Sequence, residues 1–403
     1  MLPRGWHKKT ISEILDKVSI PVDVIPSEKY REIGIRSHAR GIFHKAQVTG
    51  KSLGNKRVFH IEPNCFVVNI VFAWEQAVAK TTANELGMIA SHRFPMFKPK
   101  AGNCDIDYIL YLFKTAYGKH LLGLASPGGA GRNKTLGQSE FAKLTVNLPP
   151  IEEQSKIAKI ITIWDKAIAV TEKLISNSQQ QKQALMQQLL SGEKHFPEFN
   201  KEWNDVHLAE VADVIVSPVD KKSEQSEMAV ELCNYKDVYY NNYITQSINF
   251  MKATASESEI KKYALLVGDV IITKDSETPG DIAISALVTE GLDGVLCGYH
   301  LAIVRPKATL IDGAFLNFLF SLPKVRYYFF TLANGATRFG LSVGAINKAH
   351  FRIPTLEEQK RIAKVLTGAN HEIEILQQKL KHLKQEKKAL MQQLLTGKRR
   401  VTV

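Results

Sequence analysis

The sequence predicts a mixed α/β (α+β) protein in which two globular units are separated and joined by two long helices that form an antiparallel coiled coil. Three observations predict this fold class. The chain contains an internal duplication, each copy ends in a long segment with a heptad pattern of apolar residues, and the rest of each copy mixes strand-like with helix-like runs. A chain of 403 residues with 44% hydrophobic residues is long and apolar enough to bury two cores.

The duplication is clearest around one repeated motif. The segment PPIEEQSKIAKIIT, which begins at Pro149, aligns with PTLEEQKRIAKVLT, which begins at Pro354, at an offset of 205 residues. From Pro149 to Gly192 the two copies are identical at 19 of 44 positions without a gap. Near the start of the chain the offset is 197, where Trp6 aligns with Trp203, so the second copy carries a net insertion. A repeat of this size predicts two equivalent structural units.

The duplication divides the chain into four consecutive segments. Each copy consists of a globular unit followed by one long helix. The predicted boundaries are 1–148 for the first globular unit, 149–195 for the central helix, 196–353 for the second globular unit and 354–400 for the C-terminal helix.

Both helices carry an apolar seam with coiled-coil spacing, interrupted at Thr171, Ser178 and Lys182 in the first helix and at Lys387 in the second. Thr355 and Glu358 predict a capping box at the start of the second helix. One apolar stripe is unstable in water alone, so we expect the helices to pair, antiparallel if the copies are related by a pseudo-twofold axis. The alternative is that each helix packs only on its own globular unit. The seam residues are Ile157, Ile161, Trp164, Ile168, Ile362, Leu366, Ile373, Leu376, Leu380 and Leu383.

The charge of the chain favours a polyanionic partner. The formal net charge is +13 and the isoelectric point is near 9.3. A basic chain of this size suits nucleic acid, although the same charge could serve solubility alone.

Two kinds of segment carry basic residues that suit contact with DNA. Strand-like runs are expected at 65–74, 265–274 and 299–306. The segments 92–99 and 300–306 are expected to be counterparts in the two copies, each a strand with basic residues that suit phosphates. The glycine-rich turns PGGAGRNK and NGATRFG, one in each copy, allow close approach of the backbone to a ligand. The candidate DNA-binding residues are Arg93, Lys98, Arg132, Asn133, Lys134, Lys274, Arg305, Lys307, Thr337 and Arg338.

The sequence contains no recognisable catalytic or metal-binding set. It has no GxxxxGK[ST] loop for phosphate, no HExxH pair for zinc and no [ND]PP[YF] motif of an adenine methyltransferase. The four cysteines have neither CxxC spacing nor a nearby histidine pair, which favours reduced thiols. No apolar run is long enough to span a membrane, and the first residues do not resemble a secretory signal. We therefore expect a cytoplasmic binding protein without catalytic residues, metal or cofactor of its own.

The chain closely resembles the specificity subunit of type I restriction–modification enzymes. The resemblance covers nearly the whole chain and rests on the paired PPIEEQ and PTLEEQ motifs, the paired ALMQQLLSG and ALMQQLLTG motifs, and the glycine-rich turn before each helix. It implies that each globular unit is a target recognition domain that reads one half of a bipartite site in double-stranded DNA. It also implies that the coiled coil sets the spacing of the half-sites and docks two modification (methyltransferase) subunits.

The resemblance places the chemistry of such a complex in other chains. Modification subunits would carry S-adenosylmethionine and methylate adenine, and restriction/translocase subunits would use ATP and Mg. The present sequence departs from the pattern in its longer second unit and at Gln76, where relatives often have glycine.

Two other function classes remain open on the sequence. A coiled-coil scaffold with two protein-binding heads predicts no sequence-specific affinity for DNA. An unrecognised methyltransferase predicts cofactor binding by the isolated chain.

Overall fold

A computed structural model describes residues 2–129, 134–220 and 224–401. The chain divides into two compact units. Unit 1 comprises Met1–Glu172 and Gln378–Val403, and unit 2 comprises Lys173–Gln377. The division falls inside the long helices α6 (Ile151–Leu190) and α13 (Leu356–Leu394), so each helix contributes one end to each unit. The expected boundaries at the helix starts therefore describe the order of elements along the chain, whereas packing assigns the two ends of each helix to different cores.

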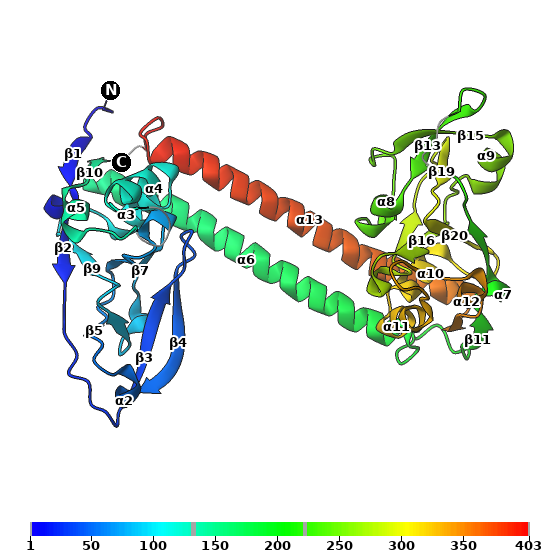
Figure 1. The fold of residues 1–403 in the computed structure, drawn as a ribbon, viewed down its shortest axis with the longest axis horizontal. Helices are drawn as coiled ribbons and strands as arrows, with labels where there is room; N and C mark the ends of the chain where they lie inside the picture. Colours follow the sequence, from blue (N-terminus) through cyan, green and yellow to red (C-terminus); the bar gives the residue numbers. More distant parts are fainter. Residues whose placement is uncertain (1, 130–133, 221–223, 402–403) are drawn as a thin grey trace. The chain divides into compact units, whose positions relative to one another are not determined.

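Unit 1 is built on two four-stranded sheets and a two-stranded one. The strand orders are β2-β9-β6-β7, β4-β3-β8-β5 and β1-β10. The hairpin of β3 and β4 is the longest strand pair of this unit (Figure 1). The strands are β1 (His7–Thr10), β2 (Leu15–Val18), β3 (Lys29–Ile35), β4 (Ile42–Thr49), β5 (Val58–His60), β6 (Phe66–Val68), β7 (Val78–Lys80), β8 (Ile89–Ser91), β9 (Met96–Pro99) and β10 (Thr145–Leu148).

The main core of unit 1 lies between its helices and the β2-β9-β6-β7 sheet. Phe66, Phe113 and Phe141 are fully buried there, with ring centroids 5.2–6.0 Å apart. Ile157 and Ile161 of α6 and Leu394 of α13 belong to the same core. The shorter helices are α1 (Ile11–Ile14), α2 (Gly50–Leu53), α3 (Ile106–Phe113), α4 (Ala116–Leu124), α5 (Gln138–Lys143), and the 3₁₀ turns η1 (Ala73–Glu75) and η2 (Ala83–Glu85).

Unit 2 has a five-stranded sheet of order β12-β20-β16-β18-β14 and a three-stranded sheet of order β15-β13-β19. Two further pairs, β11-β22 and β17-β21, complete it. The strands are β11 (Asn204–His207), β12 (Ala212–Val216), β13 (Met228–Cys233), β14 (Tyr243–Ile244), β15 (Met251–Ala255), β16 (Val270–Thr273), β17 (Asp275–Ser276), β18 (Ser285–Val288), β19 (Val295–Cys297), β20 (Leu301–Pro306), β21 (Phe339–Gly340) and β22 (His350–Ile353).

The main core of unit 2 repeats the plan of unit 1. Phe315, Phe320 and Phe329 are fully buried, and Leu189 of α6 and Ile362 of α13 join them. The shorter helices are α7 (Leu208–Val211), α8 (Tyr235–Tyr239), α9 (Glu257–Tyr263), α10 (Gly313–Phe320), α11 (Pro323–Leu332), α12 (Val343–Asn347) and the 3₁₀ turn η4 (Pro279–Asp281). The structure thus confirms the mixed fold class and the internal repeat.

The run 92–99 and the run 299–306 occupy equivalent strands, as the sequence predicts. In unit 1, β9 pairs with β2 and sets Lys98 opposite Asp16. In unit 2, β20 pairs with β12 and sets Arg305 opposite Asp213. The run 65–74 is extended only over β6, because the chain turns after Asn69, whose side chain accepts a hydrogen bond from the backbone of Val71.

The long helices run antiparallel within each unit. In unit 1, Asp165 of α6 pairs with Lys387 of α13 and Glu172 pairs with Lys384, so numbers rise along one helix as they fall along the other. In unit 2, Ser178 donates to Glu372 with the same direction of pairing. Every predicted seam residue is buried or half-buried, with Ile157, Ile161, Ile362 and Leu366 fully buried. These four side chains also pack on the globular part of their own unit, so the two packing modes expected as alternatives coexist along each helix.

The glutamine of each EEQ motif anchors its helix to the globular part of the unit. Gln154 donates to the carbonyls of Pro149 and Asn103 and accepts from the backbone N–H of Asp105. Gln359 makes the same three contacts with Pro354, Leu310 and Asp312. Asp105 and Asp312 are the N-caps of α3 and α10, so one buried amide fixes the start of two helices in each copy.

The glutamate before each anchoring glutamine is buried and faces a basic residue. Arg400 binds both carboxylate oxygens of Glu153 at 2.6 and 2.7 Å. His195 Nδ1 lies 3.0 Å from Glu358 Oε1. We call these two contacts the terminal ion pairs, because each joins the start of one long helix to the segment that follows the end of the other. The predicted capping box at Thr355 is therefore wrong in this respect: the Glu358 side chain turns toward His195, not back toward Thr355.

The glycine that ends each helix is favoured by its backbone conformation and packs against a tryptophan. Gly192 and Gly397 adopt φ angles of 74° and 70°, a region in which glycine is favoured. A Cβ atom on Gly397 would lie 3.1 Å from the Trp6 ring, and one on Gly192 would lie 3.4 Å from the Trp203 ring. The two matching tryptophans of the sequence therefore cover matching helix ends.

Candidate nucleic-acid interface

The glycine-rich turn of unit 2 is a closed loop fixed to one strand. Asn334 and Gly340 exchange backbone hydrogen bonds of 3.0 and 3.1 Å. β21 pairs with β17, which sets Gly340 opposite Asp275 and Phe339 opposite Ser276. Gly335 has a φ of 149°, and a Cβ atom there would lie 1.8 Å from the carbonyl oxygen of Arg338, so the turn requires glycine at this position. The turn thereby holds Arg338 beside β17.

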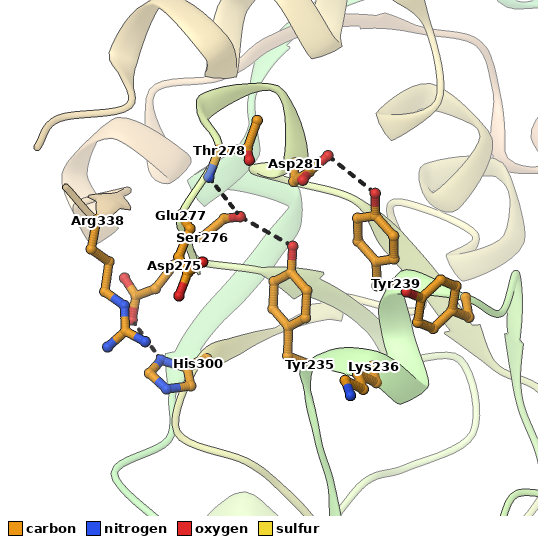
Figure 2. A pocket seen from close by; sticks show the side chains of 11 residues that line it. Tyr235, Lys236, Tyr239, Asp275, Ser276, Glu277, Thr278, Asp281, His300 and Arg338 are labelled. Carbon is orange, nitrogen blue, oxygen red and sulfur yellow. Dashed lines mark hydrogen bonds and ion pairs between the residues drawn. The ribbon is translucent and has the colours of Figure 1, made fainter. Parts of the chain in front are cut away.

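A cavity of about 350 Å³ opens beside this turn. Arg338, His300 and Asp275 lie at one side of it and Tyr239 at the other, with Tyr235 between them (Figure 2). The walls come from α8, from β17 and the loop that follows it, and from the glycine-rich turn, which are separate in the sequence. Among the residues that line this cavity only Arg338 was predicted from the sequence, and the predicted Lys274 lies behind it as the partner of Asp275.

Most polar groups of the cavity are bonded to one another. Lys274 Nζ binds both oxygens of Asp275 at 2.8 and 2.9 Å, and His300 Nδ1 lies 3.5 Å from the same carboxylate. The hydroxyl groups of Tyr235 and Tyr239 contact Ser276 and Asp281 at 3.2 and 3.3 Å (Figure 2). The charge of Asp281 raises the pKa of Tyr239, so this hydroxyl keeps its proton and donates it.

A buried arginine holds the loop that carries Asp281. Arg326 of α11 donates to the carbonyls of Ile282 and Gly280, at either end of that loop segment. Burial lowers the pKa of Arg326 from its usual value, and the nearby Asp281 opposes this effect. Arg326 therefore positions the cavity wall from behind and is not a candidate for contact with DNA.

In unit 1 the described part of the glycine-rich turn places Lys134 over an aromatic ring. Lys134 Nζ lies 5.8 Å from the centre of the Trp74 ring, a cation–π arrangement. Arg132 and Asn133, also predicted to contact DNA, lie outside the described residues. Gln76, two residues after Trp74, has φ 59° and ψ 41°, the left-handed conformation that glycine favours. Its amide donates to the carbonyls of Phe113 and Thr115, which holds the turn in place without glycine.

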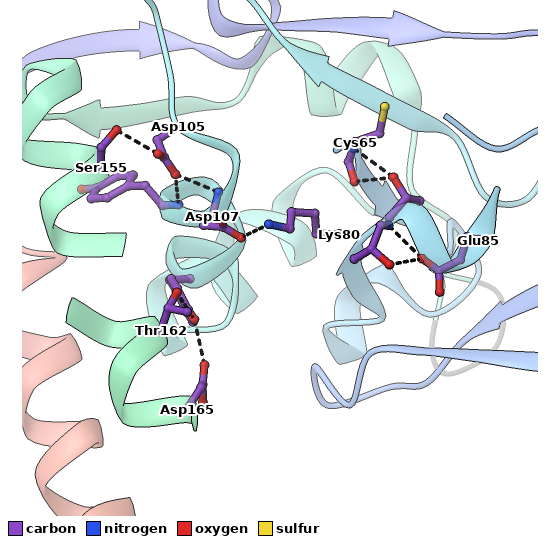
Figure 3. Close-up of polar contacts among 12 residues, drawn as sticks. Cys65, Lys80, Glu85, Asp105, Asp107, Ser155, Thr162 and Asp165 are labelled. Atoms are coloured by element: carbon purple, nitrogen blue, oxygen red, sulfur yellow. Dashed lines mark hydrogen bonds and ion pairs between the residues drawn. The ribbon is translucent and has the colours of Figure 1, made fainter. Parts of the chain in front are cut away.

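The segment around Trp74 is fixed to the long helix through α3. Lys80 at the end of β7 pairs with Asp107 of α3 at 2.6 Å, and Asp105 accepts from Ser155 of α6 at 2.9 Å (Figure 3). These contacts connect the turn that carries Trp74 to the helix that leaves the unit.

The structure gives three predicted DNA-binding residues other partners. Arg305 binds Asp269 through two hydrogen bonds of 2.7 and 2.9 Å and donates to the carbonyl of Ala264. Lys307 donates to the carbonyls of Ala209 and Glu210 in α7. These contacts occupy the charged ends of both side chains, so Arg305 and Lys307 would have to give up hydrogen bonds within the unit to reach a phosphate. Lys98 forms an ion pair with Glu62 and would have to break it to reach a phosphate.

The other predicted DNA-binding residues differ in exposure and in whether they have an ion-pair partner within the unit. Arg93 and Thr337 are exposed, as is Arg338. Lys274 is largely buried and paired with Asp275, so it acts on the cavity by neutralising that carboxylate. In unit 2 the β17-β21 pair brings the turn that carries Thr337 and Arg338 next to Asp275, the partner of Lys274. A run of tyrosines from Tyr235 to Tyr243 is the sequence signal that could have revealed the opposite wall.

Other classes of site are not evident in the described ranges. No group of three or more His, Cys, Asp or Glu side chains there could hold a metal ion. The four cysteines are buried and unpaired with one another, and burial raises the pKa of Cys65 to about 11 and that of Cys104 to about 12. Among the helices of 2–129, 134–220 and 224–401, none is both long and apolar enough to cross a membrane.

Comparison with known proteins identifies similar sequences in both halves of the chain. Residues 3–177 and 200–385 each match the family model described as type I restriction modification DNA specificity domain. The chain is 25% identical over 273 residues to the type I restriction enzyme MjaVIII specificity subunit of Methanocaldococcus jannaschii, an alignment that covers 65% of this chain and 63% of that protein. It is also 25% identical over 324 residues to the putative MjaX specificity subunit of the same organism, covering 76% and 71%.

Two solved structures share the fold at low sequence identity. The HsdS subunit from Thermoanaerobacter tengcongensis has a TM-score of 0.51 and 18% identity, and the alignment covers 98% of both chains. The type I restriction-modification system S subunit from M. genitalium has a TM-score of 0.60 and 14% identity, covering 98% of this chain and 99% of that one. These similarities extend over both globular parts and both long helices.

Proposed function

Because the chain belongs to the family of type I restriction modification DNA specificity domains, we propose that it is the DNA-reading subunit of a type I restriction–modification complex in the cytoplasm. Each unit reads one half of a bipartite site in double-stranded DNA, and partner chains perform the catalysis. One observation carries the proposal: the two units repeat one framework down to the anchoring glutamines, yet they place different side chains at the glycine-rich turn.

The contrast at the two turns supports recognition of two different half-sites. Unit 1 places Lys134 over Trp74, whereas unit 2 places Arg338 beside a cavity with tyrosine side chains. Side chains read bases by hydrogen bonds and apolar contacts to their edges, so different side chains on one framework read different sequences.

Domain exchange tests the bipartite reading. Residues 1–148 would be replaced by the corresponding unit of a relative, and methylated adenines would be mapped in a genome that also carries the modification subunits. One half of the methylated motif should change and the other should remain. A change in both halves would contradict the proposal, and absence of any sequence-specific DNA affinity would favour a protein-binding scaffold.

We propose that the paired helices set the spacing between the half-sites. The contact of Ser178 with Glu372 identifies positions at the same level of the antiparallel pair. Seven residues inserted after each of them would keep the heptad seam in register and lengthen each helix by about 10 Å. The spacer in the methylated motif should grow by about one to three base pairs, given a rise of about 3.4 Å per base pair. An active variant with the original spacer would show that the helices do not determine spacing.

We further propose that α6 docks a modification subunit. Ile163 and Val170 are seven residues apart on α6, and they are 63% and 59% exposed. Two large apolar side chains on one exposed helix face suit an apolar partner helix. Replacing both with glutamate should abolish co-purification with the modification subunit. The matched control is Ala169→Glu with Ser176→Glu, two exposed α6 positions that are also seven residues apart but lie about 100–120° around the helix from Ile163 and Val170. Full complex formation by the double variant would exclude this face.

The cofactors of the complex belong to the partners in this proposal. S-adenosylmethionine would bind the two modification subunits, while ATP and Mg would bind the restriction/translocase subunits. Calorimetry on the purified chain should show no S-adenosylmethionine binding, and saturable binding in the micromolar range would instead favour a methyltransferase.

A further inference from the structure

We propose that the cavity beside the glycine-rich turn of unit 2 reads a G·C base pair in its half-site, with Arg338 donating to guanine and Glu277 accepting from cytosine. This inference rests on the proposed function, because it takes unit 2 to be a reader of duplex DNA. It adds the identity of one base pair and the two side chains that read it.

The internal contacts of the cavity leave these two side chains unused. Asp275 is bound by Lys274 and His300, and Asp281 accepts from Tyr239. Of the charged residues that line the cavity, all of which lie in the described ranges, Glu277, Arg338 and Lys236 make no ion pair or side-chain hydrogen bond. All three are exposed. Their charged groups are therefore available to a ligand without the loss of an existing contact.

Glu277 and Arg338 flank the end of the β17-β21 pair. The ladder sets Asp275 opposite Gly340 and Ser276 opposite Phe339, so Glu277 directly follows the last paired residue of β17 and Arg338 directly precedes the first paired residue of β21. Both side chains line the same cavity. A carboxylate acceptor and a guanidinium donor on one cavity wall can reach the edges of two bases in one pair.

The charge of the cavity disfavours a phosphate as the ligand of Arg338. Lys274 neutralises Asp275, which leaves the carboxylates of Glu277 and Asp281 against the two cations Lys236 and Arg338. A phosphate placed there would therefore meet no excess of positive charge. The edge of a base pair is neutral and offers both donors and acceptors, so it suits a site that presents groups of both kinds.

Among base pairs, G·C fits this donor–acceptor pair best. Guanine presents two acceptors in the major groove, N7 and O6, which a guanidinium can bind with two hydrogen bonds. Cytosine presents an N4 amino group, which donates to a carboxylate. An A·T pair would offer Arg338 only one acceptor on thymine and would set the thymine methyl group near charged side chains.

The first test compares methylated motifs. Wild-type chain, Arg338→Ala and Glu277→Gln would each be expressed with the modification subunits, and methylated adenines would be mapped. Both substitutions should relax the same position, a G·C pair in the unit 2 half-site, and leave the other half unchanged. Arg338→Lys should relax it as well, because lysine retains the charge without the two-pronged geometry. Arg352→Ala and Glu257→Gln remove the same charges at other exposed positions of unit 2 and should leave the motif unchanged.

The second test needs no methylation. Wild-type complex would bind a cognate duplex with guanine replaced by 7-deazaguanine at the mapped position, which removes the N7 acceptor. We expect affinity to fall about 5- to 150-fold for the wild type and not to fall further for Arg338→Ala. An equal loss for both proteins would overturn the assignment of Arg338.

The outcomes separate this inference from the proposed function. An unchanged motif in all three cavity variants, with a bipartite motif in the wild type, overturns the inference and leaves the function intact. Relaxation at an A·T pair overturns the choice of base pair. A wild-type complex without any sequence preference overturns both.

Discussion

The two units make equivalent polar contacts on the long helices with different chemistry. Asp165 and Lys387 in unit 1 correspond, at the offset of 205 residues, to Asn370 and Lys182 in unit 2. Asp165 binds Lys387 at 2.5 Å and accepts from the Tyr111 hydroxyl at 2.8 Å. Asn370 instead donates to the Tyr243 hydroxyl at 2.8 Å. Lys182 has no ion pair among the described residues, and burial lowers its pKa.

The terminal ion pairs differ in the same direction. Glu153 and Glu358 are equivalent and are 2% and 0% exposed, and their partners Arg400 and His195 are also equivalent. Arg400 binds both carboxylate oxygens of Glu153, whereas His195 contacts one oxygen of Glu358. Unit 1 therefore uses a charged side chain at both places, and unit 2 uses an imidazole at one and a neutral amide at the other.

This difference shows which features of a buried polar contact stay the same between the two copies and which change. A buried carboxylate is unfavourable without a partner, so its position must face a donor in both copies. The identity of the donor is less restricted. Sequence divergence after duplication has kept the places of the contacts and changed their charges.

The anchoring glutamines should give the largest effect and the strongest test of equivalence. Gln154→Ala and Gln359→Ala each remove three hydrogen bonds of a buried side chain and should lower the local free energy of unfolding by about 2–3 kcal/mol. The loss should appear in unit 1 for the first variant and in unit 2 for the second. Hydrogen exchange of peptides from α3 and α10 would measure it, and a loss confined to one of the two variants would break the comparison.

Changing Asp165 to the residue of unit 2 should have the next largest effect. Asp165→Asn leaves Lys387, which is 18% exposed, without its ion pair, and should cost about 1–2 kcal/mol. Denaturant unfolding of wild type and variant at one pH would give the difference. Stability equal to that of the wild type would mean that Lys387 reaches water without cost.

Removal of the terminal basic residues should have a smaller effect that differs between the units. Arg400→Ala removes two hydrogen bonds to Glu153, whereas His195→Ala removes one contact with Glu358. Arg400→Ala should therefore lower the free energy of unfolding of unit 1 more than His195→Ala lowers that of unit 2. Hydrogen exchange of peptides from the start of α6 and of α13 would compare the two losses, and a larger loss in His195→Ala would contradict this order.

The smallest effect is expected from giving unit 2 the acid of unit 1. Asn370→Asp supplies Lys182 with a carboxylate, and Tyr243 can donate to it as Tyr111 donates to Asp165. We expect stabilisation of about 0.5 kcal/mol, measured by denaturant unfolding at neutral pH. Destabilisation would mean that the Lys182 ammonium group does not reach residue 370.

Much of the architecture could be predicted because it depends on repeated segments and on periodic apolar residues. The duplication gave the two units, and the heptad pattern gave the helices and their pairing. Contacts between residues far apart in sequence could not be read in this way. Arg305 was predicted to reach DNA, but in the folded chain it binds Asp269. Glu358 was predicted to cap its helix, but it contacts His195, which lies in the segment after α6.

The candidate interface was predictable only at its glycine-rich turns. The two glycines of the segment NGATRFG indicate a turn, so Arg338 could be proposed from local sequence. The opposite wall of the cavity, with Tyr235 and Tyr239, comes from α8, about a hundred residues earlier in the chain. Glu277 can be identified as a neighbour of Arg338 only from the pairing of β17 with β21, which no local pattern predicts.

The terminal ion pairs make the two halves of such a chain exchangeable. Each long helix starts with the same buried glutamate, and a basic residue follows each helix at the equivalent position. Two copies of α6 paired antiparallel would set Glu153 against His195, and two copies of α13 would set Glu358 against Arg400. A recombinant chain could join the N-terminal half of one relative to the C-terminal half of another within a helix. Its two long helices would still form an ion pair at each end. If each unit reads a half-site as proposed, new combinations of half-sites can arise by exchange of whole halves, without new contacts having to evolve between the helix ends.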